Sequence, residues 1–216
     1  MANRYRHTAS AYAFRFLRVF LSLELGTHID TLSAVNHLKV ISHKAQKNGD
    51  KAVHAMAATL EAMIHLRQSN RTENIEQAER ALALARSHQG DSIFGFLPQL
   101  VTTMQFVDIC CTQQKFDPAQ SELKMKALQT TLPTLLKGLS WKDDGSFSIP
   151  VSSPSTGVMQ SMIDGKNIAL RFNWLPREDI SALACLLSGA AMFHRNATDG
   201  QKSEQILREG LRTLDS

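Results

Sequence analysis

The chain has 216 residues, of which 43% are hydrophobic and 20% are charged, which is close to the average for soluble globular proteins and argues against extended disorder. This length suits one domain or part of an elongated one. The net charge of +4 is uneven, because residues 1–72 hold ten Lys and Arg against four Asp and Glu. This excess is typical of a solvated helix face and also suits an acidic partner, but no Lys/Arg run is long enough for a nucleic-acid-binding arm.

The cysteines and the apolar runs argue against a disulfide-rich or membrane-spanning protein. Cys110 and Cys111 are adjacent, and together with Cys185 they form neither a disulfide framework nor a CxxC metal-ligand pair, which fits a reducing compartment. The longest apolar run, 182–193, is interrupted by Ser188 and is shorter than the roughly 18 residues that a membrane span requires. We therefore expect a soluble protein that does not contact a membrane.

Apolar residues recur at helical spacing through the first two thirds of the chain and predict six helices. Recognisable start and stop signals bound them, including an N-cap at Asp30, a stop at Gly49, a second N-cap at Asp50 and the start Asp117-Pro118. The predicted ranges are 10–26, 31–48, 51–67, 72–90, 97–114 and a sixth helix from 118.

The spacing of these helices is regular and indicates a repeat architecture. Their starts fall near residues 10, 31, 51, 73, 96 and 118 and lie 20 to 23 residues apart, so two helices form a unit of about 42 to 45 residues, the size of a helical-hairpin repeat. Ala78, Leu82 and Ala85 match the small-residue pattern in the second helix of a tetratricopeptide (TPR) repeat, where small side chains let helices approach closely. The sequence thus predicts an all-α, TPR-like solenoid rather than a closed bundle.

The regular spacing ends after the sixth helix. Pro133 is expected to end or kink that helix at about Thr131, because proline lacks the backbone N–H. Residues 140–157 are rich in serine and proline and predict a surface loop. Apolar residues then alternate with others from Ile168 to Trp174, which predicts a short strand in the segment 158–174.

Helices are expected to resume at Pro176 and again near Ser203. The predicted organisation is therefore TPR-like helical hairpins over 1–139, a loop with a short extended segment over 140–174, and a further hairpin of the same array over 175–216.

No group of residues has the spacing of a catalytic or metal site. The eight histidines form no i,i+4 pair and no HExxH motif, and the nucleophile-elbow and phosphate-loop motifs do not occur. Glu178 and Asp179 are the best candidates for paired carboxylates, but adjacent helical positions diverge, and after Pro176 these acids face the positive end of the helix dipole. Trp174 or Leu175 would pack on the helix as a hydrophobic staple. We expect no catalytic residue, no cofactor or cofactor-binding residue, and no metal ligand.

Four stretches of the sequence carry a family resemblance: FRFLRVFLSLELGTHIDTLSAVNHLK (14–39), GDKAVHAMAATLEAMIHLR (49–67), NIEQAERALALARS (74–87) and NWLPREDISALACLLSG (173–189). Together they resemble fungal members of the cohesin-loading subunit family, the TPR-type partner of the large HEAT-repeat cohesin loader. The resemblance spans most of the chain and includes the serine-rich interruption. Members of this family are longer than 216 residues, so the chain is expected to be a fragment or a truncated member.

The resemblance implies a non-enzymatic function. It implies a nuclear helical superhelix that wraps an extended N-terminal segment of the large loader, the pair loading cohesin onto chromatin for sister-chromatid cohesion. Cohesin and chromatin would be indirect partners, and direct sequence-specific binding of nucleic acid is not expected.

Two other functions remain open from the residues alone, besides a stand-alone helical enzyme. Arg4, Arg6, Arg15 and Arg18 precede the first acidic residue, as in a mitochondrial protein with a cleaved presequence of about 20 residues. A generic TPR-like peptide-binding adaptor is the other alternative.

The partner-binding residues are not identified by the sequence. Tyr12, Phe14, Met63 and His65 would line either a groove or the core between helices, and their helical spacing favours the core.

Overall fold

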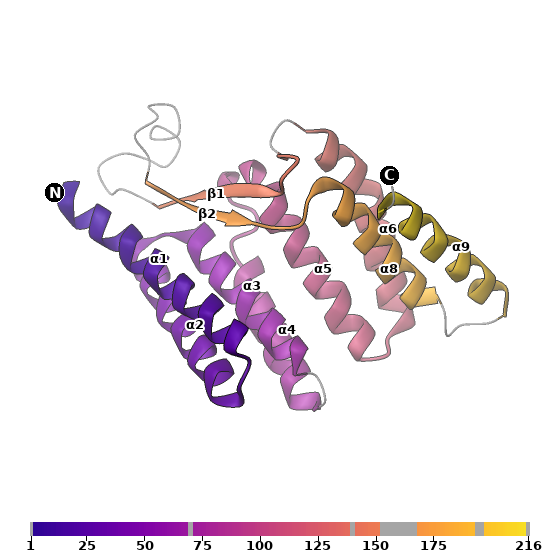
Figure 1. The fold of residues 1–216 in the computed structure, drawn as a ribbon, viewed down its shortest axis with the longest axis horizontal. Helices are drawn as coiled ribbons and strands as arrows, with labels where there is room; N and C mark the ends of the chain where they lie inside the picture. The colour runs from indigo at the N-terminus through magenta and orange to yellow at the C-terminus, as the bar shows by residue number, and fades with distance from the viewer. Residues whose placement is uncertain (1, 69–70, 139–140, 152–167, 193–196, 215–216) are drawn as a thin grey trace.

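The computed structural model describes residues 2–68, 71–138, 141–151, 168–192 and 197–214 (Figure 1). These residues form eight α-helices, one short 3-10 helix and a two-stranded sheet. The helices are α1 (Ala2–Leu25), α2 (His28–Asn48), α3 (Lys51–Arg67), α4 (Thr72–Arg86), α5 (Pro98–Gln114), α6 (Pro118–Lys137), α8 (Arg177–Met192) and α9 (Ala197–Leu214). The 3-10 helix is η1 (Ser92–Phe96), and the strands are β1 (Ser146–Pro150) and β2 (Ala169–Asn173).

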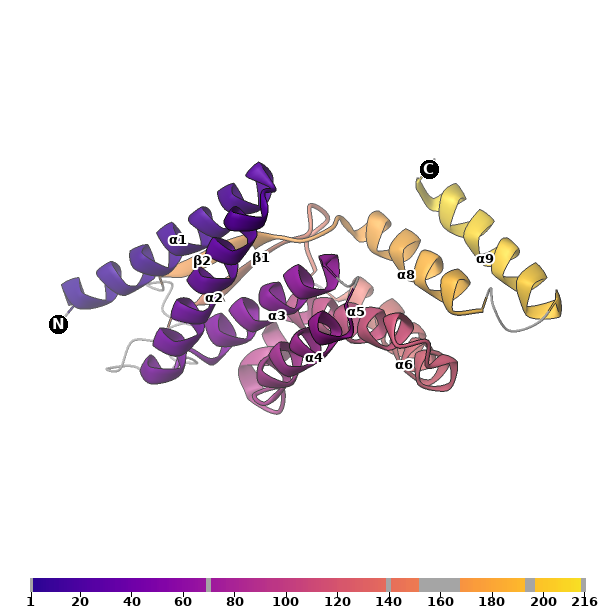
Figure 2. The same ribbon diagram turned by 90° about the horizontal axis from the view of Figure 1, so that it is seen from below.

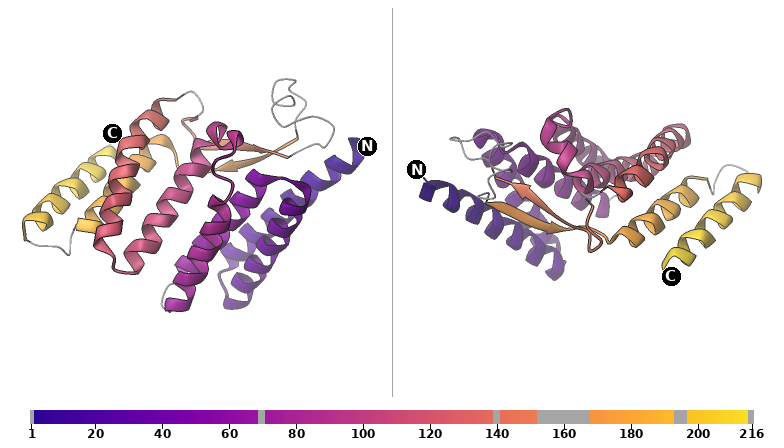
Figure 3. Two further views of the ribbon diagram at one scale, coloured as in Figure 1. Left: turned by 180° about the vertical axis from the view of Figure 1, so that it is seen from behind. Right: turned by 90° about the horizontal axis from the view of Figure 1, so that it is seen from above.

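Successive helices pack side by side in chain order, which confirms the predicted all-α repeat. Each of α1 to α6 packs on the next helix, α6 packs on α8, and α8 packs on α9. Seen from below, the helices follow a shallow arc whose concave side carries the two strands (Figure 2). The strands extend across this side from α1 toward α8 (Figure 3, right).

The helix ends follow from local sequence signals, with several differences from the prediction, among them the start of α9 at Ala197 rather than near Ser203 and the end of α4 at Arg86 rather than at residue 90. Helix α1 begins at Ala2 rather than near residue 10. Helix α2 begins at His28, because Thr27 rather than Asp30 is the N-cap and accepts a hydrogen bond from the Asp30 N–H. Asp50 precedes α3 but makes no side-chain cap, since its carboxylate accepts a hydrogen bond from a tyrosine of α1.

Other predicted signals are confirmed. Gly49 ends α2 in the left-handed conformation with φ 77°, and the Asp117 side chain accepts from the Gln120 N–H at the start of α6. Ala78 and Ala85 are completely buried on α4, as expected for the small residues of a close helix contact.

Pro133 does not end α6, which continues to Lys137. An end at about Thr131, one of the two predicted outcomes, was wrong because the missing N–H costs least at the surface. Pro133 and the residue four positions before it, Gln129, are both exposed, so water can reach the carbonyl that the proline leaves without a donor.

The serine-rich segment holds a strand where the sequence predicts a loop. Strand β1 pairs antiparallel with β2, with Phe147 opposite Phe172 and Ile149 opposite Leu170. These four side chains are buried against the helices. The signal was the alternation of serine with large apolar residues in SFSI, which the loop-like composition obscured. The β2 strand confirms the predicted strand over 169–173, whereas 158–167 lies outside the described residues.

Two apolar clusters form the core. The first joins α1 to α5 and both strands, and the second joins α5, α6 and α8 around the fully buried Trp141. Trp174, which follows β2, packs against both clusters.

Candidate peptide-binding groove

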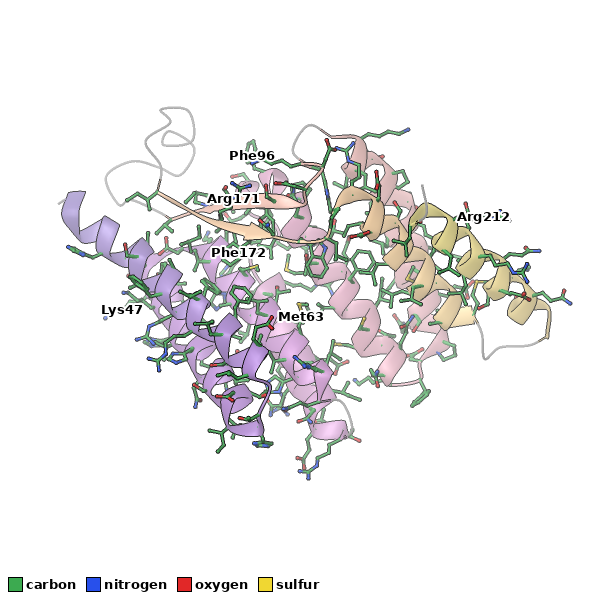
Figure 4. All side chains as sticks on the ribbon, in the orientation of Figure 1. Lys47, Met63, Phe96, Arg171, Phe172 and Arg212 are labelled. Carbon is green, nitrogen blue, oxygen red and sulfur yellow. The ribbon has the colours of Figure 1, made fainter. Side chains whose placement is uncertain are left out.

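A groove of about 350 Å³ lies on the concave side of the array, where β2 passes over the helices. Figure 4 shows Arg171 and Phe172, adjacent in β2, on opposite sides of the strand. The groove is lined by one residue of α1, three of α3, one of α5, one of β1, the last three of β2 and the residue after β2: Phe20, Met56, Thr59, Leu60, Thr103, Phe147, Arg171, Phe172, Asn173 and Trp174. We refer to this space as the β2 groove.

The floor of the β2 groove is apolar and uncharged. Met56, Thr59 and Leu60 lie within about one turn of α3 and therefore share a face of that helix. The hydroxyls of Thr59 and Thr103 each donate, at 2.7 Å, to the carbonyl four residues earlier in their own helix. The floor thus offers a ligand van der Waals contact and no free acid or base.

Phe172 fixes the strands to the helices. Its ring meets Phe16 of α1 edge-on, with 5.0 Å between centroids, and stacks on Phe147 of β1 at 5.9 Å. All three rings are more than nine-tenths buried. Such aromatic pairs contribute about 0.5–1.5 kcal/mol beyond the area that they bury. The position of β2 above α1 is therefore set by packing.

Hydrogen bonds near the start of α8, from the Trp174 backbone and the Arg177 side chain, hold the other end of the hairpin. The Trp174 N–H donates to the Gly145 carbonyl at 3.0 Å, and the Arg177 guanidinium donates to the Trp141 carbonyl at 2.8 Å. Arg177 also lies 3.4 Å from the Asp143 carboxylate. Gly145 has φ 68°, and a Cβ there would clash with the Leu175 carbonyl oxygen, so a glycine is required.

The residues of NWLPRED (173–179) have structural roles at the start of α8. Glu178 and Asp179 lie in the first turn of α8, as predicted for residues that face the helix dipole. Trp174, Leu175 and Leu183 pack against the cluster that contains Ile180, in agreement with the predicted staple.

Tyr12 anchors α1 to the turn between α2 and α3. Its hydroxyl donates to the Asp50 carboxylate at 2.8 Å and accepts from the Asn48 side-chain amide at 3.0 Å. The Lys44 ammonium lies 5.6 Å from the centre of its ring. Burial, with the adjacent Asp50 carboxylate, raises the pKa of Tyr12 well above its usual range.

The four residues that the sequence placed in either the core or a groove differ in how deeply they are buried. Tyr12 is completely buried, and Met63 and His65 are half-buried, whereas Phe14 is 69% exposed. None of the four lines the β2 groove. Core was therefore the correct expectation for Tyr12 and the wrong one for Phe14, because Phe14 lies on a face of α1 that no other described element covers.

Sequence reasoning missed a contact between two histidines. His54 of α3 is buried, and its ring centroid lies 5.3 Å from that of His88, just after α4. Burial, followed by the charge of His88, lowers the pKa of His54. No spacing signal was available, since the two residues are 34 positions apart and meet only through the packing of α3 on α4.

The cysteines lie at partly or fully buried positions. All three are free thiols, and Cys111 is buried. Burial, followed by the nearby Glu79 and Asp108 carboxylates, raises the pKa of Cys111 to about 12, which keeps the thiol protonated. In the described part of the chain, no three His, Cys, Asp or Glu side chains gather as metal ligands would.

Comparison with known proteins identifies the family. No described helix is long and apolar enough to cross a membrane. No curated protein and no solved structure matches the chain. The family model described as cohesin loading factor matches residues 1–216, the whole chain, in agreement with the sequence resemblance and the helical-repeat fold. The chain belongs to the cohesin loading factor family.

Proposed function

We propose that this chain is a non-enzymatic scaffold that binds an extended segment of the large HEAT-repeat cohesin loader, and that the pair loads cohesin onto chromatin in the nucleus for sister-chromatid cohesion. Family membership supports the role in cohesin loading. The β2 groove is the observation that supports binding of a peptide. It is an apolar hollow on the concave side of a helical-repeat array, the surface that such arrays use to hold extended partners.

The chemistry of the groove favours binding over catalysis. Arg171 is the one charged residue among those that line it, and its guanidinium lies 3.3 Å from both Asp144 and the Ser146 hydroxyl. The two threonine hydroxyls are held by backbone carbonyls. General acid–base catalysis needs a titratable group within hydrogen-bond reach of a substrate, and the groove lining supplies none.

The packing of α1 argues against a presequence that is removed. Tyr12, Phe16 and Val19 are almost completely buried in the first cluster, and Phe16 contacts Phe172. Cleavage after about 20 residues would remove these side chains and expose the apolar surface that they cover on α2, α3 and β2. The helix is part of the folded core.

Co-purification with the N-terminal segment of the large loader tests the proposal. Phe20→Glu places a charge in the β2 groove, where Phe20 is 40% exposed, and we expect at least about a tenfold loss of affinity from burying that charge. Phe14→Glu is the matched control on the same helix, because Phe14 lies outside the groove.

Calorimetric titration of the segment into each folded variant gives the affinities. The proposal is rejected if the unaltered chain, shown to be folded by circular dichroism, fails to bind the segment. Equal affinities of the two variants would place the binding site away from this groove.

A further inference from the structure

The outer edge of β2 borders the groove. Four consecutive residues, Arg171 to Trp174, line it. Side chains alternate between the two faces of a strand, so a hollow lined by consecutive residues reaches the edge of the strand. A four-residue edge is about 13 Å long.

The pairing register shows which backbone groups point to this edge. The Val151 N–H donates to the Ile168 carbonyl and the Trp174 N–H donates to the Gly145 carbonyl. In an antiparallel pair, residues alternate between facing the partner strand and facing away. The N–H and C=O groups of Arg171 and Asn173 therefore point away from β1, and neither N–H donates to any described residue.

The two edges of the hairpin are unequal. On the outer edge of β1, Pro150 has no N–H and the Ser146 N–H already donates to the Asp144 side chain at 2.8 Å. A proline and an occupied donor block a strand edge against further pairing. The edge of β2 that lines the groove has neither protection at Arg171 or Asn173.

We propose that the edge of β2 at Arg171 and Asn173 accepts a short extended segment of the large loader as a third strand. This inference rests on the proposed function and specifies how the peptide is held. Backbone hydrogen bonds to the edge supply the register, and Phe20, Met56 and Leu60 take up side chains of the added strand. Because the lining has one charge, on the already paired Arg171, the residues facing the floor are uncharged.

Backbone amide exchange measured by NMR on the unaltered chain is the direct test. On addition of the N-terminal loader segment, we expect the Arg171 and Asn173 amides to exchange about tenfold or more slowly, as for newly donated hydrogen bonds, while Ser148 on the β1 edge is unchanged. If the segment binds and neither amide is protected, the third strand does not form and the inference is overturned.

Proline substitution tests the same edge by affinity. Arg171→Pro removes an outward N–H without breaking the β1–β2 ladder, and we expect binding to weaken about tenfold, the effect of one lost hydrogen bond. Arg171→Ala also removes the guanidinium but keeps the N–H, so the difference in affinity between Arg171→Pro and Arg171→Ala measures the contribution of the N–H. Ser148→Pro alters the opposite edge and should bind as the unaltered chain does. Equal weakening by both prolines would attribute the effect to the hairpin as a whole and contradict the inference.

The binding measurements distinguish the proposed function, binding of the loader segment, from the proposed strand addition at the edge of β2. If the unaltered chain does not bind the segment, both fail. If it binds and Arg171→Pro has no effect, the strand addition alone fails. If the chain alone sediments as a dimer that Arg171→Pro dissociates, the edge pairs with a second copy of this chain, which overturns the assigned occupant.

Discussion

At the residue scale, buried polar side chains show how this fold places groups that water normally surrounds. Tyr12 and Asp50 satisfy each other by a hydrogen bond. His54 has no described partner for its Nδ1 atom and instead lies against a second imidazole. A neutral ring tolerates that position better than a charged one, since burial and a neighbouring cation both oppose protonation.

This environment predicts a pH-dependent stability. The pKa of His54 is lowered in the folded chain, so on acidification the unfolded chain takes up a proton near pH 6.5 while the folded chain does not. The free energy of unfolding should therefore decrease as the pH falls below about 6.5. Urea unfolding measured between pH 5 and 8 gives this dependence.

Substitution isolates the contribution of His54 to the loss of stability at acidic pH. His54→Phe should flatten the acid loss, whereas His43→Gln, at an exposed position of α2, should leave it as it is. An unchanged slope in His54→Phe would show that other groups cause the acid sensitivity.

At the element scale, glycines set the distance between α8 and α9. A Cβ on Gly210 would lie 2.8 Å from Cys185 Cβ, and one on Gly189 would lie 2.7 Å from the Leu207 side chain. The Ser203 hydroxyl donates to the Gly189 carbonyl across the same contact, at 2.8 Å. The two helices are as close as their backbones permit.

Adding one methyl group tests this contact. Gly210→Ala should lower the free energy of unfolding by about 1–3 kcal/mol, the usual cost of overpacking. Gly200→Ala in the same helix meets no atom within 4 Å and should be neutral or raise stability by up to about 1 kcal/mol through helix propensity. Thermal melting of both variants measures the difference, and similar melting temperatures would contradict the close packing of α8 and α9.

Most helices were predictable and the strand β1 was not. Local sequence signals predict helices, through apolar spacing and caps such as Asp117 and Gly49. The burial of β1 depends on Phe147 stacking on Phe172, which in turn meets Phe16 of α1. These residues are distant in the sequence, so no local signal outweighed the serines around β1. The β2 groove was beyond prediction for the same reason, because it exists only once β2 lies over α3 and α5.

At the scale of the whole molecule, two clusters share α5 and meet at Trp174. Asp108 of α5 adds a polar connection, since it pairs with Arg86 of α4 at 2.7 Å and with Lys124 of α6 at 2.8 Å. An array in which elements contact mainly their neighbours loses cooperativity when such a junction is weakened.

Trp174→Ala should therefore separate the unfolding of the two clusters. We expect two transitions in calorimetry where the unaltered chain shows one, with the α6–α8–α9 part unfolding first because it has the smaller apolar cluster. Trp141→Phe, within the second cluster alone, should lower the melting temperature and keep a single transition. If helix content and tryptophan fluorescence of Trp174→Ala change in the same unfolding transition, α5 suffices to couple the two clusters.

The contact between Phe16 and Phe172 also bears on how the chain acquires its structure during synthesis. The two rings are 156 residues apart in the sequence, whereas the packing of α1 on α2 needs only the first few dozen residues. At ribosomal rates of about 5–20 residues per second, α1 waits roughly 10–30 s for its strand to be made. Throughout that interval the α1 surface that β2 will cover faces solvent, so the nascent chain is most vulnerable to aggregation before residue 172 has left the ribosome.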